Sequence, residues 1–264
     1  MLHDNPNANG NPRSWRRGKI LAGFSLLFAL GMSVYLVQAS SAEALARIPS
    51  NVAWTDATIA AAYDGDALRG LLIAKKCDHC HGGEGFSSTA SIPNLAAMDR
   101  LVMWKQMADF QTGHRNSPMM RMIAVPLTSK DVADLAAYYA MLPSSSDPQD
   151  NRSFPGAPAS PADAAVAVRL ISLGDGTRGI PPCQACHGPV AYVKGAPSLA
   201  SQNADYLLQQ LEGFASGDRA NDINEPMRSI ASALTGSERH AIAAYYGGGS
   251  GRFQWAPPWA QGPR

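Results

Sequence analysis

Two short segments combine thiols with an imidazole at a spacing that suits one particular chemistry. Residues 77–81 read CDHCH and residues 183–187 read CQACH, and a glycine follows each. In C-x-x-C-H, two thiols about one helical turn apart bond one porphyrin edge as thioethers, and the histidine binds the iron from one side. The sequence therefore predicts two covalently bound haem c groups, one at Cys77, Cys80 and His81 and another at Cys183, Cys186 and His187.

Zinc sites and redox-active dithiols also use C-x-x-C, so both are alternatives to haem attachment. Here the motif occurs twice, a histidine directly follows each pair, and the pairs account for all four cysteines of the chain. A four-cysteine zinc site would have to join two segments that belong to separate modules. A thioredoxin-like dithiol is expected within a βαβ pattern, which this sequence lacks. Haem attachment is the preferred interpretation.

The sixth ligand of each iron is expected to be a methionine or histidine from the opposite side. Met120 and Met227 are the only methionines that correspond between the two halves, 39 residues after His81 and 40 after His187. Met227 follows a proline directly and Met120 follows one after a single residue, and we expect an irregular segment to deliver each side chain. Methionines often fill gaps in a core, which is the competing interpretation, and Met119 and Met122 are rivals of Met120.

The second half of the chain repeats the first, with short gaps. Beyond the C-x-x-C-H motifs, the two copies share P-x-L-A, Q-x-x-x-F-x-x-G-x-R, M-R-x-I-A and a terminal A-x-Y-Y. The shared positions pair Pro93 with Pro197, Gln106 with Gln210, Arg115 with Arg219, Met120 with Met227 and Tyr138-Tyr139 with Tyr245-Tyr246. So many matches in the same order indicate two homologous modules.

Each module shows the same helical plan, and no segment suggests a strand. Apolar residues at helical spacing predict helices over 67–76, 99–112, 164–173 and 205–216. Final helices are expected to begin at Thr128 and Thr235, where Thr-x-x-Asp and Thr-x-x-Glu resemble capping boxes. The predicted fold class is all-α.

The order of the segments predicts five parts. Residues 1–44 are an export signal or membrane anchor, 45–142 a first domain, 143–162 a Pro/Ser-rich linker, 163–247 a second domain, and 248–264 a Gly/Pro/Trp tail. The uncharged run 20–37, preceded by four basic residues, is long for a signal peptide and just long enough for an anchor helix. Either interpretation places the remainder in the periplasm, free or anchored to the inner membrane.

Charge argues against one class of partner. The formal net charge of the 264 residues is +1, and no basic stripe is present. Nucleic-acid binding is therefore not expected.

Several polar residues are expected to support the two predicted haems. The other ring nitrogen of a proximal histidine usually donates to a backbone carbonyl, and Pro93 and Pro197 are well placed to supply it. Arg115 and Arg219 are candidates to pair with propionates, although exposed arginines would look the same in sequence. Three further histidines are interpreted as surface residues: His79, His114 and His240.

Together these segments resemble the dihaem cytochromes c4, which are built from two class I cytochrome c domains. The resemblance covers roughly 66–247 and is carried by CDHCHG, CQACHG and the shared segments given above. It implies two haems close enough for rapid electron exchange, with His/Met ligation in both. It also implies redox partners, namely periplasmic dehydrogenases, a quinol oxidoreductase or a terminal oxidase.

With both axial positions filled, the iron is not open to substrate, so the expected function is one-electron transfer and not enzymatic catalysis. The sequence leaves two alternatives open. The chain is a cytochrome subunit of a dehydrogenase or terminal oxidase complex, or it is a dihaem peroxidase with one displaceable sixth ligand.

Overall fold

The regular elements of the chain are helical, as expected. A computed structural model describes residues 49–144, 160–188, 193–200 and 202–247. Within these ranges every regular element is a helix, and one isolated antiparallel bridge joins Asp175 to Ile180. The predicted N-terminal apolar helix, most of the predicted linker and the tail lie outside the described residues.

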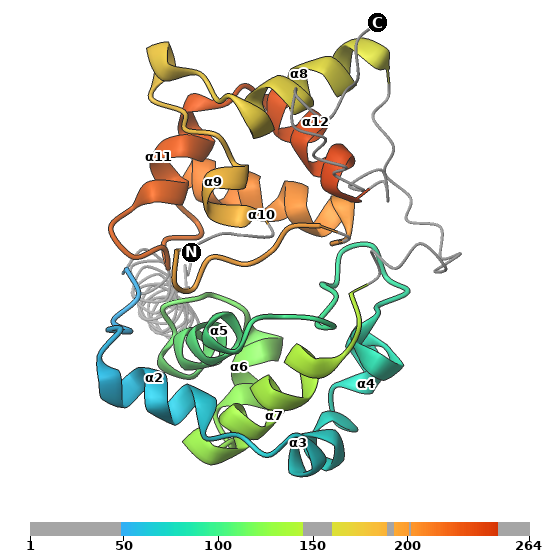
Figure 1. Cartoon of the computed structure of the whole chain (residues 1–264), viewed down its shortest axis with the longest axis vertical. Coiled ribbons are helices and arrows are strands. Elements are labelled where there is room, and N and C mark those ends of the chain that lie inside the picture. Colours follow the sequence, from blue (N-terminus) through green and yellow to red (C-terminus); the bar gives the residue numbers. More distant parts are fainter. Residues whose placement is uncertain (1–48, 145–159, 189–192, 201, 248–264) are drawn as a thin grey trace, which may run out of the picture. The chain divides into compact units, whose positions relative to one another are not determined.

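The first half of the chain, as far as it is described, holds six α-helices and one 3₁₀ turn (Figure 1). They are α2 (Asp56–Tyr63), α3 (Ala67–Ala74), α4 (Asp78–His81), η1 (Gly83–Gly85), α5 (Arg100–Thr112), α6 (Pro118–Ala124) and α7 (Ser129–Met141).

The described part of the second half repeats the order of the α-helices without a counterpart of α2, and its 3₁₀ turn precedes the C-x-x-C-H helix where that of the first half follows it. Its elements are α8 (Pro161–Ser172), η2 (Gly176–Arg178), α9 (Gln184–His187), α10 (Ala204–Ser216), α11 (Pro226–Ala233) and α12 (Gly236–Gly247). α3, α5 and α7 thus correspond to α8, α10 and α12.

Local sequence signals set the ends of the main helices. The Thr128 hydroxyl accepts from the Asp131 backbone N–H, and the Asp131 carboxylate accepts from the Thr128 N–H, which completes the predicted capping box. Thr235 and Glu238 exchange the same two bonds at α12. Gly113 and Gly217 end α5 and α10 in the left-handed conformation, so the repeat preserves this stop signal as well.

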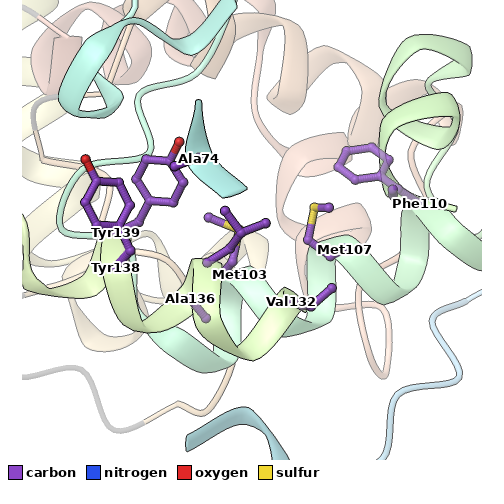
Figure 2. Packing of buried hydrophobic residues seen from close by; sticks show 10 residues of the cluster. Ala74, Met103, Met107, Phe110, Val132, Ala136, Tyr138 and Tyr139 are labelled. Carbon is purple, nitrogen blue, oxygen red and sulfur yellow. The ribbon is translucent and has the colours of Figure 1, made fainter. Parts of the chain in front are cut away.

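Each half has its own hydrophobic core between its first, middle and last long helices. In the first half, α7 packs against α3 and α5, and Figure 2 shows the core residues Met103, Met107 and Tyr139 between them. α12 packs against α8 and α10 in the second half around Leu170, Ile171 and other buried apolar residues. A buried side chain of this size stabilises the fold by about 1.5–3 kcal/mol.

Gly70 explains how closely α3 and α7 approach. A Cβ atom at this position would collide with the backbone carbonyl of Asp134 on α7. Only glycine allows the two backbones to come so near, and this contact holds the helix that leads into the first C-x-x-C-H segment.

Four helices differ from the expectation. α2 was not predicted. The segments that deliver Met120 and Met227 are short helices, not irregular segments, because Pro118 and Pro226 each occupy a first helical position, where proline is tolerated. α8 begins at Pro161, within the predicted linker 143–162, with Ser160 as its cap.

None of the helices in the described ranges combines the length and apolarity that a membrane span requires.

Candidate functional site

Both C-x-x-C-H segments form short helices that present a histidine in a fixed orientation. His81 ends α4, and its Nδ1 lies 2.8 Å from the carbonyl oxygen of Pro93. His187 ends α9, and its Nδ1 lies 2.7 Å from the carbonyl oxygen of Pro197. Because a carbonyl only accepts, Nδ1 carries the proton in each ring and Nε2 is left as the metal-binding nitrogen. Burial lowers the pKa of both imidazoles, which favours the neutral form that binds a metal.

A large cavity of about 1400 Å³ brings the predicted residues of both halves together. Ordinary ligand pockets are smaller, at roughly 300–1,000 Å³, so this space accommodates more than one ordinary ligand. All eight predicted site residues line it: Cys77, Cys80, His81, Met120, Cys183, Cys186, His187 and Met227.

The four thiols are not poised for dithiol chemistry. All are free, and burial raises the pKa of Cys77 and, to about 11, that of Cys183. Redox-active C-x-x-C sites need the opposite shift, because the thiolate is the nucleophile. Within the described residues, no group of three or more His, Cys, Asp or Glu side chains could hold a metal ion.

The two methionines that the repeat pairs lie at the same cavity as the histidines. Met120 and Met227 are half-buried, on α6 and α11, and both line the cavity. Of the rivals, Met122 is 62% exposed and lies outside the lining. Met119 is 60% exposed but does line the cavity. The geometry favours Met120 and Met227, and their ligation stays a prediction.

Tyr139 leaves a polar atom buried at the wall of this cavity. Its hydroxyl has no hydrogen-bond partner among the residues that the structure describes. Burial and the neighbouring Cys77 raise the pKa of this hydroxyl. A buried polar atom without a partner is costly, so its position suits a bound group that fills the cavity.

Arg115 and Arg219 form a matched pair across the two halves. Arg115 donates to the Oε1 atoms of Gln106 (2.7 Å) and Gln210 (2.9 Å), and to the hydroxyl of Tyr206 (2.8 Å). Arg219 donates to the same two Oε1 atoms at 3.3 Å and 2.8 Å. The guanidinium groups stack on the matched rings of each half, Phe110 and Phe214.

This arrangement places two positive charges at the cavity with amide and hydroxyl partners. Burial and the nearby Arg115 lower the pKa of Arg219, which means that its charge is under-compensated. Two carboxylates at the cavity would supply the missing negative charge, and a haem carries two propionates. Arg115, Arg219 and Tyr139 therefore fit the predicted cofactor.

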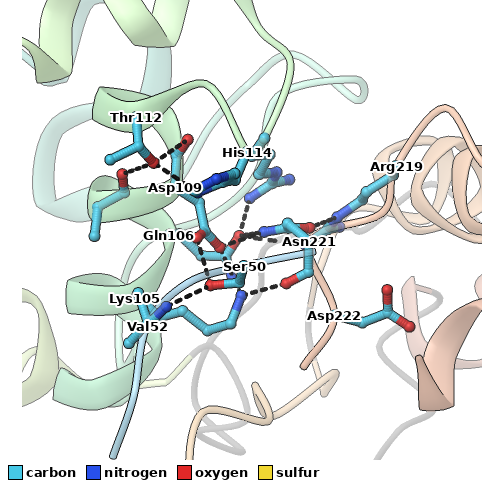
Figure 3. A network of polar contacts seen from close by, with 12 residues as sticks. Ser50, Val52, Lys105, Gln106, Asp109, Thr112, His114, Arg219, Asn221 and Asp222 are labelled. Atoms are coloured by element: carbon cyan, nitrogen blue, oxygen red, sulfur yellow. Dashed lines mark hydrogen bonds and ion pairs between the residues drawn. The ribbon is translucent and has the colours of Figure 1, made fainter. Parts of the chain in front are cut away.

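A buried ion pair lies beside the arginines (Figure 3). Lys105 Nζ is 2.6 Å from Asp109 Oδ2, and both side chains are almost fully buried. Asp109 also accepts from Ser50 at 2.6 Å and from Asn221 of the second half at 2.7 Å, and Lys105 donates to the Asn221 carbonyl. The pair thus belongs to the contact between the halves.

Sequence reasoning placed some polar residues correctly and missed others. The carbonyls of Pro93 and Pro197 accept from the histidines as predicted. His79 and His240 are exposed and His114 is half-buried against Thr112, and none of the three lines the cavity. The roles of Lys105, Asp109 and Asn221 were missed, because they have no counterpart in the repeat. The matched glutamines were visible in the sequence, although nothing there indicated that they meet.

Comparison with known proteins tests the interpretation of this geometry. The chain is 38% identical over 176 residues to cytochrome c4 of Thiocapsa roseopersicina, and the aligned region covers 65% of this chain and 86% of that protein. It is also 36% identical over 176 residues to the "thiosulfate dehydrogenase electron acceptor" of Stutzerimonas stutzeri, and this aligned region covers 66% of the chain and 78% of that protein. The chain belongs to the dihaem cytochrome c4 family. No family model matches the chain.

Solved structures support the cytochrome c4 assignment. Cytochrome c4 from Pseudomonas stutzeri superposes with a TM-score of 0.60 at 30% identity, covering 70% of this chain and 98% of that one. A thiosulfate dehydrogenase from Marichromatium purpuratum superposes with a TM-score of 0.58 at 33% identity, covering 68% of this chain and 39% of that one. As a member of the cytochrome c4 family with two C-x-x-C-H segments, the chain is a dihaem electron-transfer cytochrome with two covalently bound haem c groups.

Proposed function

We propose that the chain carries single electrons between redox proteins of the periplasm through two His/Met-ligated haems. Cys77 and Cys80 attach the first haem, and Cys183 and Cys186 attach the second. His81 with Met120, and His187 with Met227, supply the axial ligands. The observation that carries the proposal is that all eight residues line one cavity in which both imidazoles are already oriented by proline carbonyls.

The residues of the chain prepare each site for electron transfer and not for substrate binding. When bound, haem c supplies a one-electron couple whose potential depends on its axial ligands and its surroundings. The proline carbonyls hold each imidazole in one tautomer. If Met120 and Met227 supply the second ligands, a bound haem would have no open coordination position for a substrate such as peroxide. This argues against the dihaem peroxidase alternative.

A periplasmic dehydrogenase is the proposed electron donor. One relative is named for accepting electrons from thiosulfate dehydrogenase, and a thiosulfate dehydrogenase chain contains a segment with the same fold. These likenesses favour a thiosulfate-oxidising enzyme over a quinol oxidoreductase as donor. A terminal oxidase is the proposed acceptor. A cytochrome subunit within a dehydrogenase or oxidase complex is the second candidate, favoured by the same fused neighbour.

The proposed location follows from the N-terminal segment. We propose that residues 20–37, an uncharged run after a basic stretch, direct export of the chain. We propose that this run also anchors the carrier to the inner membrane. The domains are proposed to span 45–142 and 163–247, with the second extended back to the start of α8 at Pro161 and the linker 143–162 shortened accordingly.

Electron uptake by the purified holoprotein tests the proposed function. The oxidised cytochrome is mixed with a thiosulfate dehydrogenase, with and without thiosulfate, in a stopped-flow spectrometer. We expect thiosulfate-dependent reduction that consumes two electrons per chain, and no turnover when peroxide is added to the reduced protein. Rapid peroxide turnover would contradict a carrier function, whereas a lack of reduction by this donor alone would exclude only the proposed partner.

A further inference from the structure

The loop that carries Pro93 is held by the second half of the chain. The Asn203 amide donates to the carbonyl oxygens of Ile92 (2.6 Å) and Thr89 (3.2 Å). The backbone N–H of Tyr206 donates to the carbonyl oxygen of Ala90 at 3.1 Å. These bonds come from the start of α10 and the residues before it, more than 100 positions away in sequence.

Gln202 contacts the residue that follows Pro93 with both ends of its amide. Its Oε1 accepts from the backbone N–H of Asn94 at 2.7 Å, and its Nε2 donates to the carbonyl oxygen of Asn94 at 3.0 Å. The backbone N–H of Asn203 also donates to the same Oε1, at 2.9 Å, which fixes the orientation of the amide. Asn94 is only 5% exposed, so water does not readily replace these bonds.

The first of these bonds reaches the peptide group that orients His81. The carbonyl of Pro93 and the N–H of Asn94 belong to one peptide unit. Its oxygen accepts from His81 Nδ1 while its N–H donates to Gln202. A hydrogen bond at the N–H end polarises the unit and strengthens its carbonyl as an acceptor, because linked hydrogen bonds reinforce one another.

The second half has no matching device in the described residues. The spacing that pairs Pro93 with Pro197 places Met98 at the position of Gln202, and a thioether has no amide with which to bridge a peptide. Within the described ranges, no hydrogen bond to the N–H of Ser198, the partner of the Pro197 carbonyl, is found. The effect of Gln202 is therefore confined to the first half.

We propose that Gln202 of the second half is a positioning residue for the proximal ligand of the first haem. It acts through the Pro93–Asn94 peptide and His81, so the docking of the two halves sets the potential of one haem and leaves the other unchanged. The inference rests on the proposed role of His81 as proximal ligand.

The direction of the effect follows from the chain of bonds. A stronger acceptor at Nδ1 makes the imidazole a better electron donor to the iron and favours the ferric state. Without Gln202, the His81–Pro93 bond weakens and the first haem is reduced more easily.

The test replaces Gln202 with methionine, the residue found at the matched position, which keeps the length of the side chain. We expect Gln202→Met to raise the reduction equilibrium constant of the first haem, by up to about fivefold, the factor equivalent to one neutral hydrogen bond. The reduction equilibrium constant of the second haem should not change. In the NMR spectrum, the His81 Nδ1 proton should exchange with solvent several-fold faster, and the His187 proton should exchange as before.

Matched variants separate this effect from a general loosening of the interface. Gln209→Met changes an exposed glutamine on α10 and should leave the reduction potentials of both haems unchanged. Asn203→Ala removes two hydrogen bonds to the same loop but spares the Pro93–Asn94 peptide. It should therefore lower the free energy of unfolding, and it should shift the potential of the first haem less than Gln202→Met does. Met227→Ala identifies the second haem in the titration, and circular dichroism verifies that each variant is folded.

The inference would be overturned if the first haem of a folded Gln202→Met protein kept its reduction potential. It would also be overturned if the potentials of both haems shifted equally. A larger potential shift in Asn203→Ala than in Gln202→Met would also overturn it. None of these results would touch the proposed function, provided that the variants retain two haems and still take up electrons. Loss of haem attachment or of low-spin ligation in the unmodified protein would instead count against the proposed function.

Discussion

His81 and His187 show how one backbone carbonyl prepares a side chain for metal binding. The carbonyl oxygens of Pro93 and Pro197 accept a hydrogen bond from Nδ1–H of these histidines, which leaves Nε2 available. This contact could be predicted from sequence because the motif defines the histidine and the repeat aligns the two prolines. The burial of the Lys105–Asp109 ion pair could not be predicted from sequence. A lysine and an aspartate at this spacing on an exposed helix would form an ordinary surface pair, and the two cases look the same in sequence.

Replacing each axial methionine tests the ligand assignment at the residue scale. Met120→Ala removes the sulfur proposed to face the first iron, so we expect about half of the methionine-to-iron charge-transfer absorption of the ferric protein to disappear. Met227→Ala should remove the other half. Met122→Ala is the matched control, because this methionine lies on the same helix, is 62% exposed and does not line the cavity. Loss of the band in Met122→Ala would contradict the assignment.

The main helices are defined by signals that act over a few residues. Capping residues such as Thr128 and Thr235, the glycines that end α5 and α10, and the apolar spacing between them were readable without a structure. α2 was not, because its run of alanines gives no clear apolar face and its position depends on packing against α7. The short helices α6 and α11 were missed because a proline indicates a helix start or a loop equally well.

The link between η2 and α12 makes stability depend on pH in a defined window. Arg178 binds both carboxylate oxygens of Glu238, at 2.8 Å and 2.9 Å, and this contact holds the pKa of Glu238 at about 2. The folded pKa lies below the unfolded value, so the stabilisation is complete above about pH 4.5 and is lost as the pH falls towards 2.

Comparing Glu238→Gln with the unmodified protein checks this window. At neutral pH the variant should have the lower free energy of unfolding in denaturant titrations followed by circular dichroism. The difference should shrink steadily between about pH 4.5 and pH 2, where the native glutamate becomes protonated as well. If the difference in free energy of unfolding stays constant down to about pH 2, the charge of the Glu238 carboxylate does not contribute to stability.

At the scale of the whole molecule, the two halves meet through polar side chains that the repeat had already paired. Gln106 and Gln210 each bind both arginines, so positions equivalent in sequence face one another in space. Sequence periodicity reports which side chains face the core of one half, and it carries no information on how two halves dock. This is why the modules were predictable and their contact was not.

The buried pair at this contact is expected to be sensitive to the loss of one partner. Asp109→Ala leaves the Lys105 charge buried without its carboxylate, which costs about 3–5 kcal/mol of unfolding free energy. The double variant Lys105→Met/Asp109→Leu removes both charges and should recover most of that loss. Denaturant unfolding of the holoprotein measures both. If the double variant is no more stable than Asp109→Ala, the unpaired charge is not the cause.

The state of both irons in the unmodified oxidised protein tests the central claim most directly. Electron paramagnetic resonance of the ferric holoprotein, recorded before and after addition of peroxide, reports the ligation of each haem. We predict two low-spin signals of equal intensity that peroxide leaves unchanged, as expected when a histidine and a methionine occupy both axial positions. A high-spin signal from either haem that reacts with peroxide would contradict the assignment of this chain as an electron carrier.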